Sequence, residues 1–250
     1  MESHYTFHFL DKAVFSCYNL KETQAKLHKW GLSPSMSLAK FRFDLPFSEF
    51  SPETFLTNLV NSPVISSVLP QFSTAKKKDP VTSISYKSLK CTETTMDLFQ
   101  ILKAHNLVYE SGVIRKVMPE YVDDIEICDK IREVLLFEES EDFGIIDESV
   151  RAEFLFRIFE HLCIGGGMCQ YEDEIDEYLE VVKGLYKDLV AVSKDEESGE
   201  IRVAGKVYQI EVNEELELFR NKHLQDFCYV VVDPGYRHVN VWMHKWTGLW

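Results

Sequence analysis

The hydrophobic and polar positions at the start of the chain follow two different periods. Residues 5–10 (YTFHFL) and 40–44 (KFRFD) alternate apolar with polar side chains, which is the period of a half-buried strand. Residues 51–60 (SPETFLTNLV) begin with a serine suited to the N-cap and a proline suited to the first helical position. The pattern predicts strand, helix, strand and helix in succession, with loops at 31–37 and 71–80.

The middle of the chain continues this alternation. It predicts a strand over 81–89, a helix near 93–105, a strand over 111–118 and a helix over 124–137. The acidic residues 137–149 are expected to connect this part to the second half. The sequence contains no internal repeat, heptad run or low-complexity segment.

The last sixty residues are rich in strand patterns. Residues 189–212 predict a hairpin that turns at Asp195–Gly199, and residues 226–244 predict a second one that turns at Asp233-Pro234-Gly235. Because FCYVVV (227–232) is apolar on both faces, we expect it at the centre of a sheet covered on both sides.

These elements together predict an α+β fold with a mixed, largely antiparallel sheet and packed helices. We expect residues 1–250 to form a single compact domain, with one candidate sub-boundary near the loop at 71–80.

Two predicted helices flank the stretch HLCIGGGMCQYEDEIDEY at 161–178. The first is expected to begin at Asp147 or Ser149 and to pack in the core, with a narrow polar stripe. The second is opened by acids and carries lysines near its far end, an order that complements the helix dipole. The polar stripe comprises Glu153, Arg157, Glu160 and His161, and the opening acids are Glu172, Asp173, Glu174, Asp176 and Glu177.

The same stretch is rich in residue types that serve in chemical sites. A zinc site would need Cys163 and Cys169 with two distant ligands, and His161 is turned about 200° away from Cys163 on the helix. A phosphate loop would follow a strand, whereas Gly165-Gly166-Gly167 follows a predicted helix and no lysine comes after it. The pattern favours a structural turn whose first glycine is a left-handed C-cap.

Motifs of nucleophilic and metalloprotease catalysis are absent from the sequence. A general acid/base pair among the acids of the second helix is an alternative that would need burial. At the last hairpin, His238 and His244 share one strand face with Trp242 between them, while Asp233 and Arg237 flank the turn. These residues suit either a structural role or a small site or partner contact.

Charge and cysteine usage narrow the class of protein further. The formal net charge is −14, and residues 126–250 carry 13 Lys and Arg against 28 Asp and Glu. This acidity disfavours nucleic acid and anionic lipid as partners and favours basic protein surfaces. The six cysteines form no CxxC pair and no sequon occurs, which is typical of reduced cytosolic thiols. The start of the chain predicts no secretion signal, and no membrane span is expected.

Three segments resemble the cilia- and flagella-associated protein 300 family: REVLLFEESEDFG, the long run from Glu153 to Val192, and FCYVVVDPGYRHVNVWMH. YTFHFL, KFRFDLPFSEF and ESGVIRKVM are also similar to it, so that the resemblance covers nearly the whole chain. Its most specific part is HLCIGGGMCQYED. The resemblance is weakest at 60–90 and 211–226.

The resemblance implies a non-enzymatic protein of the cytoplasm and motile cilium that assembles outer and inner axonemal dynein arms. The implied partners are cytoplasmic dynein-arm assembly factors, axonemal dynein subunits and the intraflagellar transport machinery. No catalytic, cofactor or metal residues are carried over. The candidate partner-binding residues are Gly165, Gly166, Gly167, Gln170, Tyr171, Glu172, Asp173, Asp233, Arg237 and His238. The alternative is an enzyme or metal-dependent module with its site near the Gly165–Gly167 turn or the Asp233–His244 hairpin.

Overall fold

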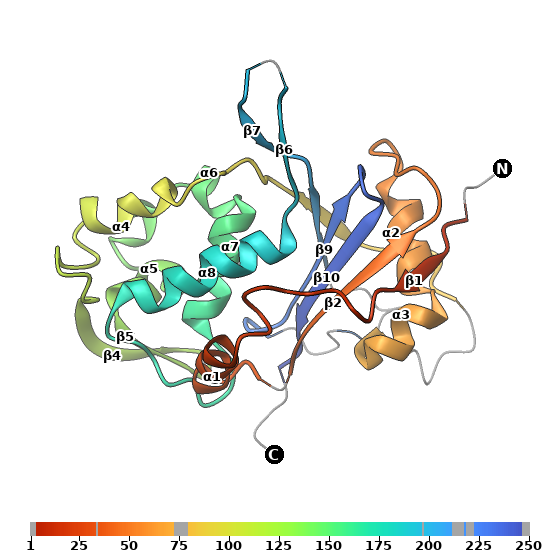
Figure 1. Cartoon of the computed structure of the whole chain (residues 1–250). Helices are drawn as coiled ribbons and strands as arrows, with labels where there is room; N and C mark the ends of the chain where they lie inside the picture. The colour runs from red at the N-terminus through yellow and green to blue at the C-terminus, as the bar shows by residue number, and fades with distance from the viewer. Residues whose placement is uncertain are drawn as a thin grey trace. The chain divides into compact units, whose positions relative to one another are not determined.

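The computed structural model describes residues 4–33, 35–72, 80–196, 198–211, 218 and 223–246. The chain forms two compact units, each built from separated segments (Figure 1). Unit 1 comprises Met1–Val14, Pro34–Leu89 and Leu189–Trp250, and unit 2 comprises Phe15–Ser33 and Lys90–Asp188. The chain therefore crosses between the units four times.

Unit 1 is built on a six-stranded sheet with the strand order β1-β2-β10-β9-β8-β3. Every pairing between neighbouring strands of this sheet is antiparallel. The strands are β1 (Phe7–Phe9), β2 (Met36–Phe43), β3 (Tyr86–Leu89), β8 (Lys206–Ile210), β9 (Phe227–Asp233) and β10 (His238–His244).

β9 lies inside this sheet, between β10 and β8. Its first six residues are all buried, on both faces of the strand. A strand with one wet face would alternate buried and exposed positions instead. The central position predicted from FCYVVV is therefore confirmed.

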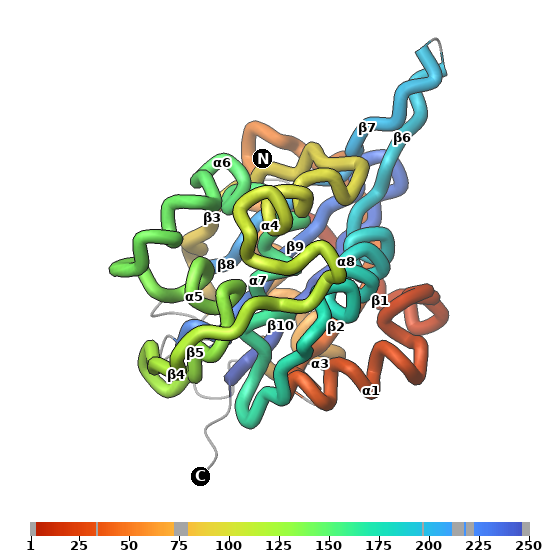
Figure 2. Tube along the Cα trace, turned by 90° about the vertical axis from the view of Figure 1, so that its left-hand side faces the viewer, coloured from red at the N-terminus to blue at the C-terminus, as the bar shows by residue number. Residues whose placement is uncertain are grey.

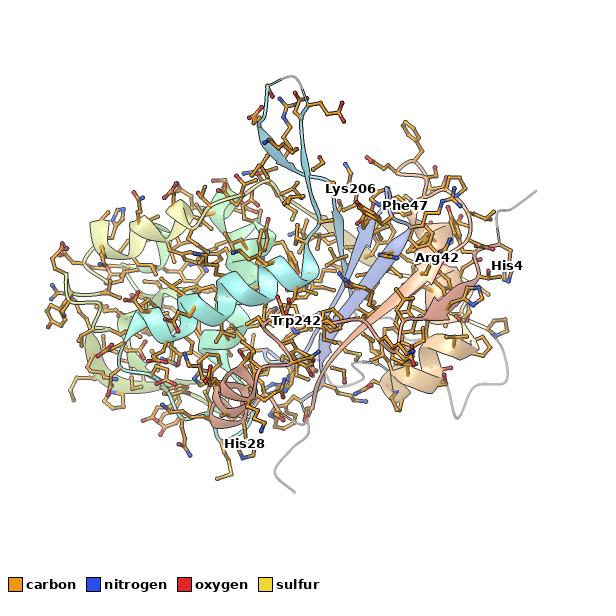
Figure 3. All side chains as sticks on the ribbon, in the orientation of Figure 1. His4, His28, Arg42, Phe47, Lys206 and Trp242 are labelled. Atoms are coloured by element: carbon orange, nitrogen blue, oxygen red, sulfur yellow. The ribbon has the colours of Figure 1, made fainter. Side chains whose placement is uncertain are left out.

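Two helices of unit 1, α2 (Pro52–Val60) and α3 (Pro63–Val68), share one hydrophobic core with the sheet. Each begins with a proline, whose fixed φ suits the first helical turn. Ser51 is the N-cap of α2 as predicted, although its side chain makes no capping hydrogen bond. Phe47 packs its ring on Phe55 and on Tyr208 of β8, which joins the loop after β2 to this core (Figure 3). A short 3₁₀ helix, η1 (Pro70–Phe72), follows α3.

The hairpin β6 (Val192–Lys194) and β7 (Ile201–Val203) extends away from the other strands of unit 1 in both views (Figures 1 and 2). The predicted turn at Asp195–Gly199 is confirmed, since Asp195 Oδ1 accepts from Ser198 N and Gly199 adopts a φ of +72°. The rest of the predicted hairpin segment pairs elsewhere, because residues 206–210 form β8 of the six-stranded sheet.

Unit 2 is mainly helical, with one two-stranded sheet, β4 (Lys116–Val122) and β5 (Ile125–Asp129). The central helix α7 is apolar nearly all round, and nine of its eleven residues are buried. Within the described chain, no helix is both long enough and apolar enough to cross a membrane. The helices are α1 (Lys21–Lys29), η2 (Asp97–Phe99), α4 (Gln100–Ala104), α5 (Lys130–Leu136), η3 (Phe143–Ile145), α6 (Glu148–Arg151), α7 (Phe154–Ile164) and α8 (Ile175–Leu189).

The helix predicted over 124–137 is wrong in its first half. Residues 125–129 form β5, in which buried and half-buried positions alternate, and α5 starts only at Lys130. The isoleucines of β5 are β-branched and suit a strand. Asp129 ends the strand and caps the helix, because its side chain accepts from Arg132 N.

The core helix predicted to start at Asp147 or Ser149 is divided into α6 and α7. Asp147 is the N-cap of α6, and Glu153 is the N-cap of α7. Glu153 is therefore wrongly assigned to a polar stripe: it is fully buried, accepts from Thr92 N at 3.1 Å and pairs with Lys90 Nζ at 2.9 Å. His161 is also buried rather than on a polar face.

Several elements are shorter than predicted or are shifted along the chain. The strand over 81–89 is confined to β3, the helix near 93–105 to residues 97–104, and the strand over 111–118 is displaced to β4. The loop at 31–37 ends earlier, because β2 begins at Met36. The α+β class is confirmed. A single domain over the whole chain stays a prediction, and most of the sub-boundary near 71–80 lies outside the described residues.

Residues 15–18, the first residues of unit 2, are held by Asp188 near the end of α8. Its carboxylate accepts from Ser16 N at 2.6 Å, Ser16 Oγ at 2.8 Å, Cys17 N at 2.9 Å and Tyr18 N at 2.8 Å. Cys17 also lies against Gly184, where a Cβ would come within 2.2 Å of the Cys17 sulfur. One buried carboxylate thus fixes the segment that leads into α1.

Candidate functional site

The three glycines at 165–167 reverse the chain after α7 and lie against the end of α1. Gly165 N donates to His161 O at 2.9 Å, which ends α7, and Gly165 has a φ of +70°. Gly166 N donates to Trp30 O at 2.8 Å, and Gln170 N donates to Lys29 O at 2.9 Å. These two amides thus bind carbonyls of the chain itself, where a phosphate loop would direct them at an anion.

The glycines allow a backbone approach that no other residue type would permit. A Cβ on Gly31 would lie 2.3 Å from Gly167 O, and one on Gly165 would lie 2.6 Å from Trp30 O and 2.4 Å from Cys169 Sγ. Gly31 also has a φ of +70°, a region that favours glycine. The turn is therefore one half of a contact between two helix ends, which we call the glycine contact (Gly31 with Gly165–Gly167).

Glu172 holds the same helix end through its side chain. The residue is 8% exposed, and its Oε1 accepts from Trp30 Nε1 at 2.9 Å while Oε2 pairs with Lys29 Nζ at 2.6 Å. Its backbone N donates to the hydroxyl of Tyr178 at 3.0 Å. The Trp30 and Tyr178 rings lie 4.8 Å apart. Glu172 is thus a buried structural partner of α1 and lies before α8, which starts at Ile175.

Arg132 forms the centre of this region, although it is not among the residues predicted from the sequence. It is fully buried and pairs with Asp129, the residue that caps α5. Its Nη2 donates to Cys163 O at 2.7 Å and to the Tyr178 hydroxyl at 2.8 Å. The guanidinium carbon lies 3.4 Å from the centroid of the Tyr171 ring, a cation–π contact. Arg132 therefore ties α5, the end of α7 and the start of α8 together.

The signal for this cluster is the spacing Asp129-x-x-Arg132 at a helix start. A helix predicted from residue 124 conceals it, because both residues then fall in the helix interior. With the strand β5 in place, Asp129 is recognisable as an N-cap three residues before an arginine.

Tyr171 contributes its ring to the cluster, and its hydroxyl donates to Glu126 O at 3.2 Å. Burial raises the pKa of Tyr171 to about 12, although the Arg132 cation opposes the shift. The hydroxyl therefore stays protonated at neutral pH and acts as a donor.

The exposed residues of the stretch at 161–178 are different from the buried ones that hold α1 and Arg132. Gln170 is exposed, Met168 is 78% exposed with a φ of +59°, and Asp173 pairs with Lys116 Nζ at 2.7 Å. Among the predicted partner-binding residues of this stretch, Gln170 and Asp173 thus lie at the surface, whereas Gly165, Gly166 and Glu172 are buried. Gly167 and Tyr171 are half-buried.

The cysteines of the stretch have environments that disfavour the thiolate. Burial raises the pKa of the fully buried Cys163, and it raises the pKa of Cys169 to about 12 against the opposing effect of Arg132. A thiolate is the form that binds metals and attacks electrophiles. In the described part of the chain, no group of three or more His, Cys, Asp or Glu residues could hold a metal ion.

The predicted hairpin residues belong to unit 1 and form the turn between β9 and β10. Asp233 Oδ1 accepts from Gly235 N at 3.0 Å and Tyr236 N at 3.1 Å, an Asx turn. Arg237 has a φ of +53° and donates from Nη1 to Asp44 O at 2.6 Å. Asp233 and Arg237 thus shape the turn.

His238 is half-buried beside this turn. Burial lowers its pKa, and the Lys40 and Arg42 cations on β2 lower it further against the opposing effect of Asp233. As predicted, His238, Trp242 and His244 lie on one face of β10, since the strand is regular through all three.

Comparison with known proteins gives consistent matches over most of the chain. A family model described as "Cilia- and flagella-associated protein 300" matches residues 4–244. A protein of that name from Paramecium tetraurelia is 35% identical over 224 residues, which cover 90% of this chain and 87% of the relative. One from Chlamydomonas reinhardtii is 31% identical over 248 residues, covering 94% and 95%. No solved structure matches the chain.

Proposed function

Because the chain belongs to the cilia- and flagella-associated protein 300 family, we propose that it is a non-enzymatic interaction protein needed to assemble outer and inner axonemal dynein arms. It acts in the cytoplasm with cytoplasmic dynein-arm assembly factors. It binds axonemal dynein subunits and enters the motile cilium or flagellum with the intraflagellar transport machinery. Nucleic acid and membrane are not among the expected partners.

The observation that carries this proposal is the family match over residues 4–244. The absence of a catalytic role is supported by how the chemical groups of the stretch at 161–178 are used. The glycine amides bind backbone carbonyls, the buried carboxylate of Glu172 binds Lys29 and Trp30, and the pKa values of Cys163 and Cys169 are raised by burial. Each of these groups therefore contributes to folding.

Deletion of the gene in a ciliated cell tests the role in assembly. We expect axonemes that lack outer and inner dynein arms in electron micrographs, while dynein heavy chains remain detectable in the cytoplasm. Re-expression of the intact chain should restore the arms. Normal arms in the deleted cell would contradict the proposal.

Affinity purification from ciliating cells tests the partners. Dynein subunits, their assembly factors or transport proteins should be enriched with the intact chain. Elemental analysis of the purified protein tests the alternative of a metal-dependent module, which a stoichiometric metal would favour.

A further inference from the structure

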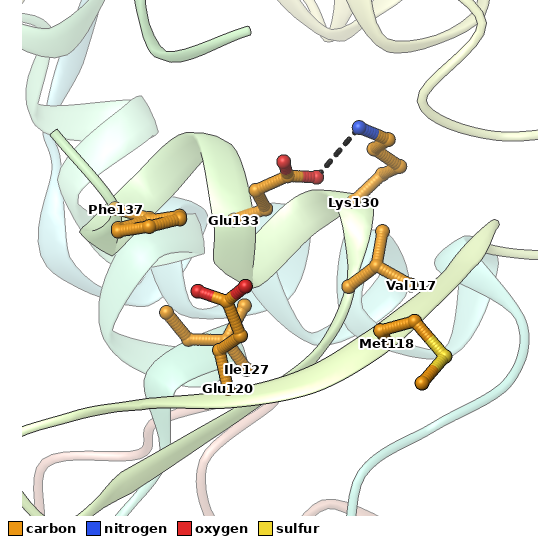
Figure 4. A pocket seen from close by; sticks show the side chains of 7 residues that line it. All are labelled: Val117, Met118, Glu120, Ile127, Lys130, Glu133 and Phe137. Carbon is orange, nitrogen blue, oxygen red and sulfur yellow. Dashed lines mark ion pairs between the residues drawn. The ribbon is translucent and has the colours of Figure 1, made fainter. Parts of the chain in front are cut away.

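A cavity of about 370 Å³ opens between α5 and the β4–β5 sheet of unit 2 (Figure 4). Val117, Ile127 and Phe137 line it with apolar surface, and Met118, 84% exposed, lies beside Val117. Its volume is near the lower limit of about 300 Å³ for small-ligand sites. The cavity therefore suits one long side chain better than a nucleotide or another large cofactor.

A bulge in β4 creates this space. Lys116 pairs with Asp129 and Glu120 pairs with Ile127, so that residues 117–119 of β4 face a single residue of β5. A bulge bends its strand and leaves the extra residues outside the hydrogen-bonded ladder. Val117 and Met118 are thereby available to line a cavity instead of a continuous sheet.

The polar groups of the cavity are predominantly acidic. Glu120 and Glu133 both line the cavity, and the Glu120 carboxylate is directed from β4 towards α5 (Figure 4). The Glu133 carboxylate faces Lys130, and its Oε1 accepts from Ser140 Oγ at 2.8 Å. Lys130 Nζ lies 2.6 Å from an oxygen of Glu133 and 2.6 Å from one of Asp142. One ammonium therefore already faces two carboxylates, and Glu120 adds a third negative charge.

The net charge of unit 2 as a whole adds to the negative potential at the cavity. The unit contains 13 Lys and Arg against 25 Asp and Glu, a net charge of −12. Such an excess raises the local concentration of cationic groups and speeds their association.

We propose that the cavity receives the side chain of an arginine or lysine carried by an extended segment of a partner protein. The aliphatic stem lies against Val117, Ile127 and Phe137, and the cationic group binds Glu120, beside the ion pair of Glu133 and Lys130. Met118 adapts its flexible side chain to the entering segment. The inference deepens the proposed function, because it rests on the chain acting by binding proteins and names the kind of segment bound.

Binding of defined peptides to the full-length ¹⁵N-labelled chain tests the inference. The probes are capped seven-residue threonine-valine peptides that differ only in a central arginine, glutamine or glutamate. We expect the arginine peptide to shift the backbone amide signals of residues 117, 118, 120, 127 and 130–137. Its dissociation constant should be at least about tenfold lower than that of the glutamine peptide, and it should rise with salt.

Two substitutions localise the contact. Glu120→Gln should raise the dissociation constant of the arginine peptide by about three- to tenfold, since it removes one carboxylate of the cavity. Glu126→Gln is the matched control, because it makes the same change one residue before Ile127, on the opposite face of β5. It should leave the affinity within about twofold.

Three results would overturn the inference. The first is equal binding, or no binding, of all three peptides. The second is binding of spermidine at the same signals as tightly as the arginine peptide, which would assign the site to a free polyamine. The third is concentration-dependent self-association of the chain that Glu120→Gln abolishes, which would make a second copy the occupant. A failed peptide titration leaves the dynein-arm phenotype of the gene deletion as a separate test of the proposed function.

Discussion

At the scale of single residues, unit 2 depends on buried charges that all have partners. Arg132, Glu153 and Glu172 are each at most 8% exposed, and each is met by hydrogen bonds or an opposite charge. A buried ion pair contributes little net stability compared with an apolar replacement, but removing one partner leaves an uncompensated charge. These residues should therefore be sensitive to single substitutions and tolerant of paired ones.

Arg132→Met tests this asymmetry. It leaves the Asp129 carboxylate buried without its cation, so the free energy of unfolding should fall by about 3–5 kcal/mol. The double variant Asp129→Asn/Arg132→Met should recover part of the loss, because asparagine still caps a helix and carries no charge. Urea unfolding followed by circular dichroism measures both. Equal losses in the single and double variants would show that the charge is not the cause.

His244 makes a pH-dependent contribution to unit 1. It is 1% exposed and its Nδ1 lies 2.7 Å from Gln225 O. Burial lowers its pKa, which the backbone contact to Gln225 opposes and His223 reinforces. Because the folded pKa lies below the unfolded value, the stabilisation is present above pH 6.5 and is lost as the pH falls through the folded pKa.

Urea unfolding at pH 7.5 and 5.5 should therefore show a smaller loss of stability on acidification for His244→Gln than for the unsubstituted chain. His28→Gln is the control, because His28 is exposed on α1 (Figure 3). An unchanged loss in His244→Gln would assign the acid sensitivity to other groups.

At the scale of elements, the glycine contact joins the end of α1 to the end of α7. Both Gly31 and Gly165 have a φ of +70°, and a Cβ on either would collide with backbone or sulfur atoms. The strain of a left-handed residue costs about 1–2 kcal/mol, and the collision adds to it. The two helix ends cannot keep this approach if either glycine is replaced.

Gly31→Ala and Gly165→Ala should each lower the free energy of unfolding by more than about 2 kcal/mol. Gly144→Ala is the matched control, since nothing lies within 4 Å of a Cβ at that position. It should be neutral or stabilise by up to about 1 kcal/mol, because alanine restricts the unfolded chain. Similar losses at all three positions would show that the contact is not responsible.

At the scale of the whole molecule, neither unit is a continuous piece of chain. Unit 2 requires residues 15–33 as well as 90–188. The first segment supplies the donors to Asp188 and the Trp30 side chain that binds Glu172. Cutting the sequence at any single point between these segments therefore separates groups that stabilise one core.

A fragment of residues 90–188 should be less stable than one in which residues 15–33 are restored through a short flexible linker. The expected signs are a weaker near-ultraviolet circular dichroism signal and a lower urea midpoint for the shorter fragment. A fragment that replaces Trp30 with alanine in the linked form should fall between the two. Equal stability of all three would contradict a dependence on the first segment.

Hydrophobic patterns along the sequence determined the α+β class, the central position of β9 and the two hairpin turns. These are local properties: strand alternation, two apolar faces and turn residues are written in neighbouring positions. The same patterns placed a helix over β5, because isoleucines at 125, 127 and 131 fit either period over a short segment.

Only the tertiary structure decided which residues of the glycine-rich stretch are buried and what they hold. Arg132 is charged, and charged side chains are usually exposed to solvent. Only the packed structure shows that it is buried with a carboxylate, a carbonyl and a hydroxyl as partners. Gly31 and Gly165 are far apart in the sequence, and their need for glycine arises from each other's backbone. Such requirements are set by long-range contacts, which a local pattern does not encode.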